Sequence, residues 1–291
     1  MKVRIAIGLG GAAMTSEELA SIVTAMAAER FDSLWISEVL TGPGPDPLIA
    51  LATAARLSPS IKLGTTMLLP GRNEIRLAKS LASLDVLSGG RLLITFVPGL
   101  AYGAEREAIG TPVGERAAAI ERTIPRLRTW WAGGEVDGIS VAPRPLQDPL
   151  EIWLGGLART SLERCGRIAD GWLGAGCLAA GAESAKVTIE AAARAADREV
   201  DPEHFGMSIG YSRRPLDDRQ LAALRARNRN PDVDPQSLVP LGLEALRRSL
   251  ESFIAVGISK FVLRPIAVDS AWPDELAELA EAVGDLQNLG G

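Results

Sequence analysis

The stretch from residue 61 to residue 97, IKLGTTMLLPGRNEIRLAKSLASLDVLSGGRLLITFV, contains one complete strand–helix–strand unit. Ile61–Leu68 is a short apolar run that predicts a strand, and Asn73–Leu87 carries apolar residues at helical spacing. The Gly-Gly pair that follows is typical of a helix C-terminus, and Arg91–Val97 is a second apolar run. Because a strand–helix–strand crossover joins parallel strands, this unit predicts an α/β fold.

The same alternation continues through the rest of the chain. Further strands are predicted at Val3–Leu9, Ser33–Ser37, Glu151–Leu154, Gly171–Leu173, Phe205–Tyr211 and Lys260–Arg264. Further helices are predicted at Ser16–Glu29, Pro47–Leu57, Glu115–Trp131, Arg159–Ile168, Glu183–Ala196, Leu243–Val256 and Pro273–Gln287. Eight strands, each followed by a helix, predict a (β/α)8 TIM barrel, one α/β domain over residues 1–291 with short insertions. An open doubly wound sheet is the alternative, but its G-x-G-x-x-G turn is missing after the first strand.

Two segments interrupt this rhythm. Ala132–Pro149 is rich in Gly and Pro and predicts an excursion with a small hairpin. Asp217–Pro240 is polar, rich in arginine and predicted to be irregular. The overlapping stretch Arg213–Arg229 is either a lid over the tail of a ligand or a solvated loop. The sequence leaves these two alternatives open.

Composition excludes several classes of partner. The 291 residues carry a net charge of −5 without a clustered Lys/Arg stripe, which argues against nucleic acid. Cys165 and Cys177 form neither a disulfide framework nor a metal-ligand spacing, so no metal site is expected. The N-terminus lacks the apolar run of a signal peptide, and no stretch is long and apolar enough to span a membrane. We therefore expect a cytoplasmic protein.

The C-terminal ends of the predicted strands, where TIM barrels place their active sites, carry mainly Gly, Thr, Pro and Arg. Glu38 is the one carboxylate at these ends, whereas glycoside hydrolysis needs two. Lys62 and Lys260 begin their strands, at the wrong end for a Schiff base. The sole histidine, His204, precedes its strand and is expected to be a solvated loop residue. A rim without acid–base groups predicts that a bound cofactor carries the reaction.

Two glycine turns follow neighbouring strands. Gly155–Gly156 precedes a predicted helix, and Gly174–Ala175–Gly176 follows the next strand. Main-chain N–H groups at a helix N-terminus bind anions, and Arg213, Arg214 and Arg264 would add positive charge. This pattern favours a phosphate site. Simple tight turns and solvated arginines are the alternative.

Five motifs together resemble a known family. They are Phe31–Glu38 (FDSLWISE), Leu63–Pro70 (LGTTMLLP), Leu77–Arg91 (LAKSLASLDVLSGGR), Ile152–Gly156 (IWLGG) and Ala169–Trp172 (ADGW). In their order and spacing they resemble the bacterial luciferase-like monooxygenase superfamily, whose members bind FMN or the deazaflavin coenzyme F-420. The resemblance covers nearly the whole chain and implies the same barrel. It implies coenzyme F-420 as the cofactor, with FMN as the alternative, because compact members look more like the deazaflavin branch.

The resemblance also implies which residues hold the cofactor. It implies a non-prolyl cis peptide bond between Thr66 and Met67, which would form a bulge behind the cofactor ring. Glu38, the sole catalytic candidate, would either bond the ring or hydroxyl edge of the cofactor or cap a loop. The tail phosphate is expected on the two glycine turns. The implied cofactor-binding residues are Glu38, Thr66, Met67, Pro98, Gly99, Gly155, Gly156, Gly174, Ala175 and Gly176.

The chain departs from the sugar-phosphate dehydrogenases of this superfamily at two positions. Val39 and Leu100 stand where those enzymes carry His and Glu. Because the groups that abstract a proton from an alcohol are missing, we expect a reductase of a small organic substrate, with the proton supplied by solvent. The alternatives are an FMN-dependent monooxygenase fed by a separate flavin reductase, and a non-catalytic flavin-binding barrel. The resemblance also implies a homodimer, and the region of Tyr102 is expected to shape the substrate side.

Overall fold

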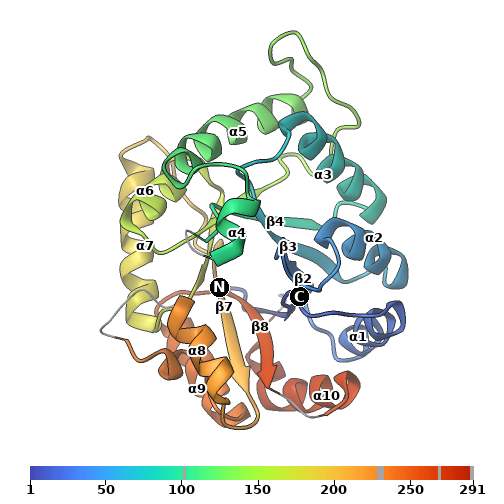
Figure 1. The fold of residues 1–291 in the computed structure, drawn as a ribbon, viewed down its shortest axis with the longest axis vertical. Helices are drawn as coiled ribbons and strands as arrows, with labels where there is room; N and C mark the ends of the chain where they lie inside the picture. Colours follow the sequence, from blue (N-terminus) through green and yellow to red (C-terminus); the bar gives the residue numbers. More distant parts are fainter. Residues whose placement is uncertain (101–102, 228–232, 268–269, 289–291) are drawn as a thin grey trace.

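The computed structural model describes residues 1–100, 103–227, 233–267 and 270–288, and it forms a closed barrel (Figure 1). All neighbouring strands pair in parallel in chain order, and the last strand pairs with the first. This closed ring confirms the predicted TIM barrel. The strands are β1 (Arg4–Leu9), β2 (Ser33–Ser37), β3 (Lys62–Leu68), β4 (Leu92–Val97), β5 (Ile152–Gly155), β6 (Gly171–Ala175), β7 (Phe205–Ser212) and β8 (Lys260–Ala267).

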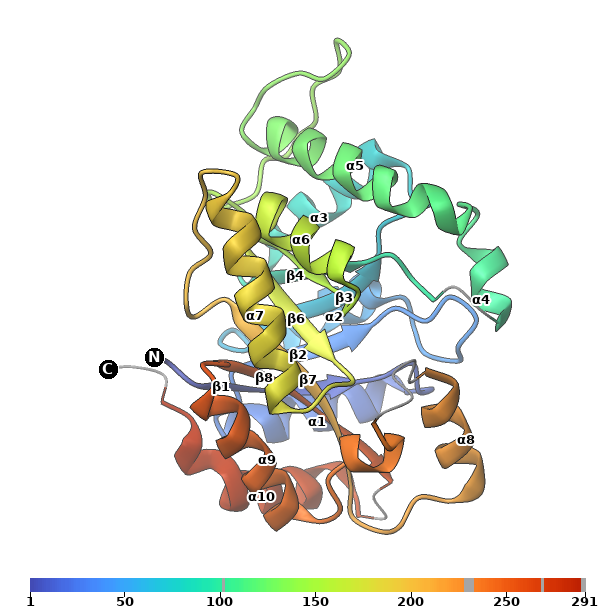
Figure 2. The ribbon, with the colours of Figure 1, turned by 90° about the vertical axis from the view of Figure 1, so that its left-hand side faces the viewer.

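Helices surround the barrel, and several begin at capping residues. The Thr15 side chain accepts from the Glu18 amide while Glu18 accepts from the Thr15 amide, and Asp46 and Asn73 cap the next two helices. The helices are α1 (Ser16–Ala28), α2 (Pro47–Leu57), α3 (Glu74–Ser88), α4 (Gly103–Ala108), α5 (Arg116–Trp131), α6 (Arg159–Ile168), α7 (Ala179–Arg194), α8 (Asp218–Arg227), α9 (Leu243–Ala255) and α10 (Trp272–Val283). Figure 2 shows α4 and α8 beyond the C-terminal ends of the strands, with the N-terminus at the other end of the barrel.

Alternation along the strands divides the core into two parts. Outward side chains such as Ile5, Ile7 and Met67 pack against the helices in the larger hydrophobic cluster. Inward side chains form a smaller cluster that fills the barrel, and its members are Ala6, Trp35, Trp153, Leu173 and Val262. The two tryptophans fit because their strand neighbours are glycines. This inner cluster is the floor beneath any site at the C-terminal ends.

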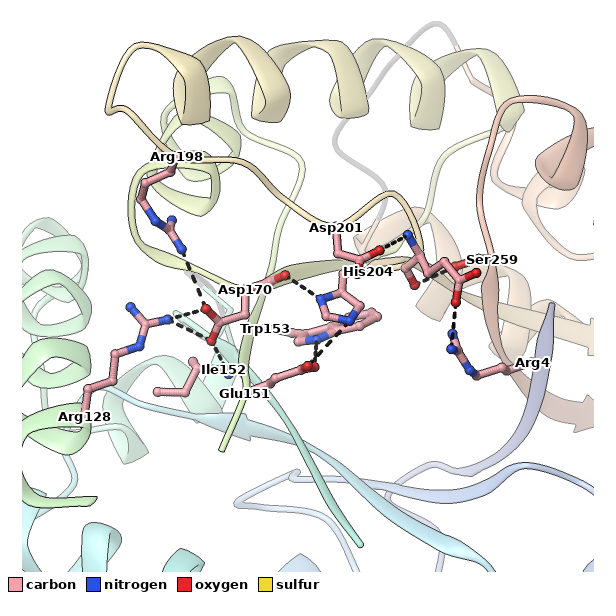
Figure 3. Close-up of polar contacts among 11 residues, drawn as sticks. Arg4, Arg128, Glu151, Ile152, Trp153, Asp170, Arg198, Asp201, His204 and Ser259 are labelled. Atoms are coloured by element: carbon pink, nitrogen blue, oxygen red, sulfur yellow. Dashed lines mark hydrogen bonds and ion pairs between the residues drawn. The ribbon is translucent and has the colours of Figure 1, made fainter. Parts of the chain in front are cut away.

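The N-terminal end of the barrel holds a network of charged and polar groups (Figure 3). Arg128 donates to both carboxylate oxygens of Asp170 at 2.8 Å, and the Ile152 amide donates to the same carboxylate. His204 Nδ1 lies 2.9 Å from the Asp170 main-chain oxygen, and its ring packs 5.4 Å from Trp153. The prediction of a solvated histidine is therefore wrong, because the loop before β7 folds under the barrel.

The structure corrects one further expectation for the loops and confirms another. The stretch Asp217–Pro240 was expected to be irregular, but it contains α8, which starts with reciprocal hydrogen bonds between Asp217 and Gln220. This D-x-x-Q pattern is a capping signal in the sequence. The excursion at 132–149 does contain a hairpin, reduced to a single antiparallel bridge between Val136 and Ile139. Tyr102 and residues 228–229 of the suggested lid lie outside the described residues.

Candidate active site at the C-terminal end of the barrel

The inward positions just above the inner cluster carry small, hydroxyl or glycine residues. Side chains alternate along a strand, so the residue two positions after an inward residue also faces the barrel axis. Arg264 is the one charged residue among these eight strand positions. The eight positions are Gly8, Ser37, Thr66, Thr95, Gly155, Ala175, Ser208 and Arg264. Residues this small let main-chain groups approach a ligand closely.

Thr95 is the most unusual of these residues. Its side chain is fully buried, and its Oγ1 has no hydrogen-bond partner. It pairs in register with Thr66 on the neighbouring strand, so two hydroxyl-bearing residues lie side by side on the inner wall. A buried hydroxyl without a partner costs about 1–3 kcal/mol. Such a cost at the C-terminal end of a strand suits a group that gains its partner from a ligand.

Glu38 follows β2 and is tied into the loop between β3 and α3. Its Oε2 accepts from the Leu68 amide at 2.8 Å, and its Oε1 pairs with Arg72. Arg72 also donates from Nε to the Leu68 carbonyl at 2.7 Å. Burial raises the pKa of the Glu38 carboxyl, and the charge of Arg72 offsets only part of that effect. Glu38 is thus tied to the loop by Leu68 and Arg72, and Arg72 is the partner that sequence reasoning missed.

A second arginine that sequence reasoning missed holds the loop after β4. Arg116 is 2% exposed and donates to the main-chain oxygens of Leu100 at 2.7 Å and Pro98 at 3.3 Å. It begins α5, where a cation opposes the helix dipole. An arginine at this unfavourable position is a sequence signal that its side chain has a partner outside the helix. The residues Pro98 and Gly99, expected to bind the cofactor, are thereby fixed in place by α5.

The two glycine turns, Gly155–Gly156 and Gly174–Ala175–Gly176, differ in the space around their glycines. Gly176 has a φ of +77° and open space where a Cβ would lie, and Gly156 has a φ of +121° before α6. Neither α6 nor α7 has a side-chain cap, so their first amides are not covered by a capping side chain. Gly174 differs, because a Cβ there would lie 2.3 Å from the Trp172 ring. Gly174 is therefore required by packing against Trp172.

The segment Thr66–Met67 lacks the expected backbone feature. The cis peptide bonds of the described residues are Ala142–Pro143 and Asp148–Pro149, so the bond between Thr66 and Met67 is not cis. The parallel register with β4 runs without interruption through this point. Met67 is fully buried against the helices, so its side chain points away from the barrel mouth.

Two of the three arginines suggested for a phosphate have different partners. Arg213 pairs with the buried Glu275 at 3.5 Å and with Glu278, both on α10. Arg264 instead enters the barrel, where its Nε donates to Ser208 Oγ at 2.9 Å. In the part of the chain that the structure describes, no group of three or more His, Cys, Asp or Glu residues could hold a metal ion.

Comparison with known proteins settles the family. A family model described as luciferase-like monooxygenase matches residues 2–230. This chain belongs to the luciferase-like monooxygenase family. The computed fold agrees: the structure of a coenzyme F-420-dependent tetrahydromethanopterin reductase from Methanopyrus kandleri superposes with a TM-score of 0.80 at 19% identity over 98% of both chains. A monooxygenase from Streptomyces bottropensis superposes equally well, covering 97% of this chain and 99% of its own.

The curated relatives of this luciferase-like chain match over shorter stretches. An uncharacterized protein of Mycobacterium tuberculosis is 30% identical over 142 residues, 44% of this chain and 49% of the relative. The oxygenase component of a flavin-dependent trigonelline monooxygenase from Acinetobacter baylyi is 32% identical over 38% of this chain and 34% of its own. A coenzyme F-420-dependent glucose-6-phosphate dehydrogenase from Nakamurella multipartita is 27% identical over 54% and 51%. The matched part thus spans about half or less of each relative.

The residues at the barrel mouth fit the flavin or deazaflavin that these relatives indicate. Gly176 leaves open space before α7, and neither α6 nor α7 has a capping side chain where a phosphate could bind the first amides. Thr95 supplies a buried hydroxyl that lacks a partner within the protein. No helix among the described residues has the length and apolar character needed to cross a bilayer. Relatives of both kinds, F-420-dependent and flavin-dependent, are found, so the comparisons do not decide between the two cofactors.

Proposed function

We propose that this protein is an oxidoreductase that transfers a hydride between coenzyme F-420 and a small organic substrate, as a reductase. The observation that carries the proposal is the chemistry of the barrel mouth. Its strand positions offer hydroxyls, main-chain amides and Arg264, and its nearby carboxylate, Glu38, is already engaged by Leu68 and Arg72. A bound deazaflavin would supply the hydride, which leaves binding and orientation to the protein.

In this proposal the chain's own residues have four tasks. The amides after Gly155 and Ala175, at the starts of α6 and α7, would bind the phosphate of the cofactor tail. The Thr66 and Thr95 hydroxyls would bond polar atoms at the edge of the ring. Glu38 would act indirectly, because it fixes the loop that follows Leu68. The inner cluster beneath them would exclude water from the lower side of the ring.

An FMN-dependent monooxygenase, supplied with reduced flavin by a separate reductase, is the second candidate. It is favoured by the 32% identity to the oxygenase component from Acinetobacter baylyi. Both candidates use the same mouth and the same phosphate site. They differ in the central ring of the cofactor, so direct binding separates them.

The test is a titration of the purified protein with coenzyme F-420 and, separately, with FMN. Quenching of deazaflavin fluorescence at micromolar concentration, without FMN binding, would support the reductase. FMN binding alone would favour the monooxygenase. Binding of neither cofactor in either oxidation state would overturn both candidates. If F-420 binds but its reduced form is not reoxidised by a panel of enones, the protein is a non-catalytic barrel.

A matched pair of variants tests the role of Thr95. Thr95→Val removes the unpartnered buried hydroxyl without changing side-chain shape, so the fold should keep its stability. We expect cofactor affinity to fall about two- to tenfold, the range of one hydrogen bond. Thr53→Val, at an exposed position of α2, is the control and should leave affinity unchanged. Equal affinities for the two variants would show that Thr95 does not contact the cofactor.

A further inference from the structure

A cavity of about 280 Å³ lies outside the ring of strands, between the start of α3 and the middle of α5. Figure 1 shows these two helices side by side on one flank of the barrel. The residues that line the cavity are Arg72, Asn73, Glu74, Ile75, Arg122 and Arg126. Its volume is close to the lower end of the range for small-molecule sites, about 300 Å³. Three guanidinium groups therefore border a space of the size of a small ligand.

Glu74 holds two of these arginines through their Nε atoms. Arg122 donates from Nε to Glu74 Oε1 at 3.0 Å, and Arg126 Nε lies 2.7 Å from Oε2. Thr123 Oγ1 also donates to Oε1 at 2.8 Å, so both oxygens of the carboxylate are occupied. The N–H of Arg126 Nε is buried and is not aligned with an acceptor, and Arg126 Cζ lies 5.4 Å from the centroid of the Trp130 ring. Glu74 and Trp130 thus fix the two arginines without using their terminal nitrogens.

The terminal nitrogens of the three arginines are only partly used by the protein. Arg72 Nη2 pairs with Glu38. Arg126 Nη2 donates to Asp137 at 2.7 Å, and neither of these two carboxylates lines the cavity. Within the described part of the chain, the other four terminal nitrogens, Nη1 of Arg72, Nη1 of Arg126 and both of Arg122, have no hydrogen-bond partner. Several N–H donors around one cavity match an anion with several acceptor oxygens.

We infer that this cavity binds a small molecule that bears a phosphate monoester, held by Arg72, Arg122 and Arg126. A phosphate monoester presents three strong acceptor oxygens and carries a charge of about −1.5 to −2 at pH 7. Three guanidiniums suit such a group, whereas the two oxygens of a planar carboxylate are matched by one guanidinium. Ile75, which is partly buried, offers an apolar contact to the carbon part of the ligand. The inference goes beyond the proposed function, because it concerns a site outside the barrel mouth.

Arg72 connects this cavity with the barrel mouth. Its Nε donates to the Leu68 carbonyl at 2.7 Å, while the Leu68 amide donates to Glu38 Oε2 at 2.8 Å. A ligand bonded to Arg72 Nη1 would stabilise this arrangement by mass action. Hydrogen exchange of the Leu68 amide should therefore slow by up to about a hundredfold at a ligand concentration of 100 Kd. Unchanged exchange at saturation would show that Arg72 does not hold the ligand.

The first experiment compares three probes on the unmodified protein by isothermal titration calorimetry. Glycerol 3-phosphate, glycerate and glycerol share a three-carbon skeleton and differ in the anionic group. We expect glycerol 3-phosphate to bind at least about tenfold more tightly than glycerate, the effect of one further charge-assisted hydrogen bond. Glycerol should show no measurable binding. Equal affinities for glycerol 3-phosphate and glycerate would overturn the inference.

The second experiment uses Arg122→Gln with Arg248→Gln as the matched control. Arg122 and Arg248 are both 63% exposed and both pair with a glutamate, but Arg248 does not line the cavity. The exposure of both positions means that neither replacement should prevent folding. The affinity for glycerol 3-phosphate should fall at least about tenfold in R122Q and stay unchanged in R248Q. Equal affinities in the two variants would contradict the assignment.

The glycine turns after β5 and β6 are the competing site for the same phosphate, because they are proposed to hold the cofactor tail. Glycerol 3-phosphate should still bind when coenzyme F-420 saturates the protein, and F-420 affinity should be equal in R122Q and wild type. Displacement by F-420, with binding unaffected by R122Q, would place the phosphate at the mouth and overturn the inference. Binding that R122Q abolishes would support the outer site even if neither F-420 nor FMN binds, so failure of the proposed function is distinguishable from failure of this inference.

Discussion

Asp32→Asn should destabilise the barrel by about 3–5 kcal/mol, because it leaves the buried ammonium group of Lys260 without its carboxylate partner. Lys260 Nζ lies 2.9 Å from Asp32 Oδ2, and both side chains are 5% exposed. In D32N, Lys260 would keep its contact with the face of the Trp35 ring, whose centroid lies 5.7 Å from Nζ. A cation–π contact contributes about 0.5–2 kcal/mol, which is too little to replace a buried ion pair.

The reciprocal change, Lys260→Met, should cost less, about 1–3 kcal/mol. Asp32 would still lie 3.5 Å from Lys62 Nζ and accept from Ser33 Oγ at 2.9 Å. Burial opposes ionisation of Asp32, but Lys260 and Lys62 together hold its pKa below the ordinary value. Removing both charges in D32N/K260M should return stability to near wild type, because neither group is then buried alone.

Urea unfolding at pH 7, followed by tryptophan fluorescence and circular dichroism, measures all four corners of this cycle. Lys62→Met is the control, since Lys62 is 46% exposed and should contribute less than about 1 kcal/mol. Additive single-variant effects, or a larger loss for K260M than for D32N, would refute the reasoning. The lowered pKa of Asp32 adds a second check: its contribution to stability is present above about pH 4 and is lost as the pH falls through its folded pKa.

Three other expectations follow from the contacts. Asp85→Ala should lower the free energy of unfolding by about 3 kcal/mol, because the buried Asp85 carboxylate accepts hydrogen bonds from the Leu146 and Gln147 amides. Loss of these bonds should also speed proteolysis within residues 132–149. An unchanged cleavage rate would contradict this expectation. Burial raises the pKa of Cys165 to about 12 and of Cys177 to about 11, so a disulfide reagent at pH 8 should label neither quickly before unfolding. Burial raises the pKa of Glu38 in the folded state, so the contribution of Glu38 to stability should decline as the pH rises through that folded pKa. In Glu38→Gln, this decline in the free energy of unfolding with rising pH should disappear.

The barrel was predictable because its signals are local. Strand Ser33–Ser37 and helices Pro47–Leu57 and Arg159–Ile168 match their predicted bounds. The start of α7 was missed by four residues because its cap is Leu178, which carries no capping hydroxyl or carboxylate. β8 continues three residues beyond the predicted Arg264, through Pro265, which sequence rules place at strand edges or ends.

The site was predictable only in part, because its contacts join distant segments. Glu38 was identified since a carboxylate directly after a strand lies at the C-terminal end of a barrel. Its partner Arg72 lies 34 residues further along, and no spacing rule connects the two. The inward direction of Thr95 follows from strand alternation, but its lack of a partner depends on the neighbouring strands. The packing of Gly174 against the Trp172 ring likewise depends on the three-dimensional structure and has no signal in the sequence.

The two ends of the barrel use charge for different purposes, and this limits how a proton can reach a substrate. Lys260 and Asp32 form a buried pair at the N-terminal end of β8, four residues before Arg264. Four strand residues span about 13 Å, and Trp35, Trp153 and Leu173 fill the space between. A proton cannot cross that apolar layer to the mouth without a chain of hydrogen-bonding groups. A proton that completes a reduction at the mouth would therefore not come from this buried pair, and the rate of that step should not respond to D32N/K260M.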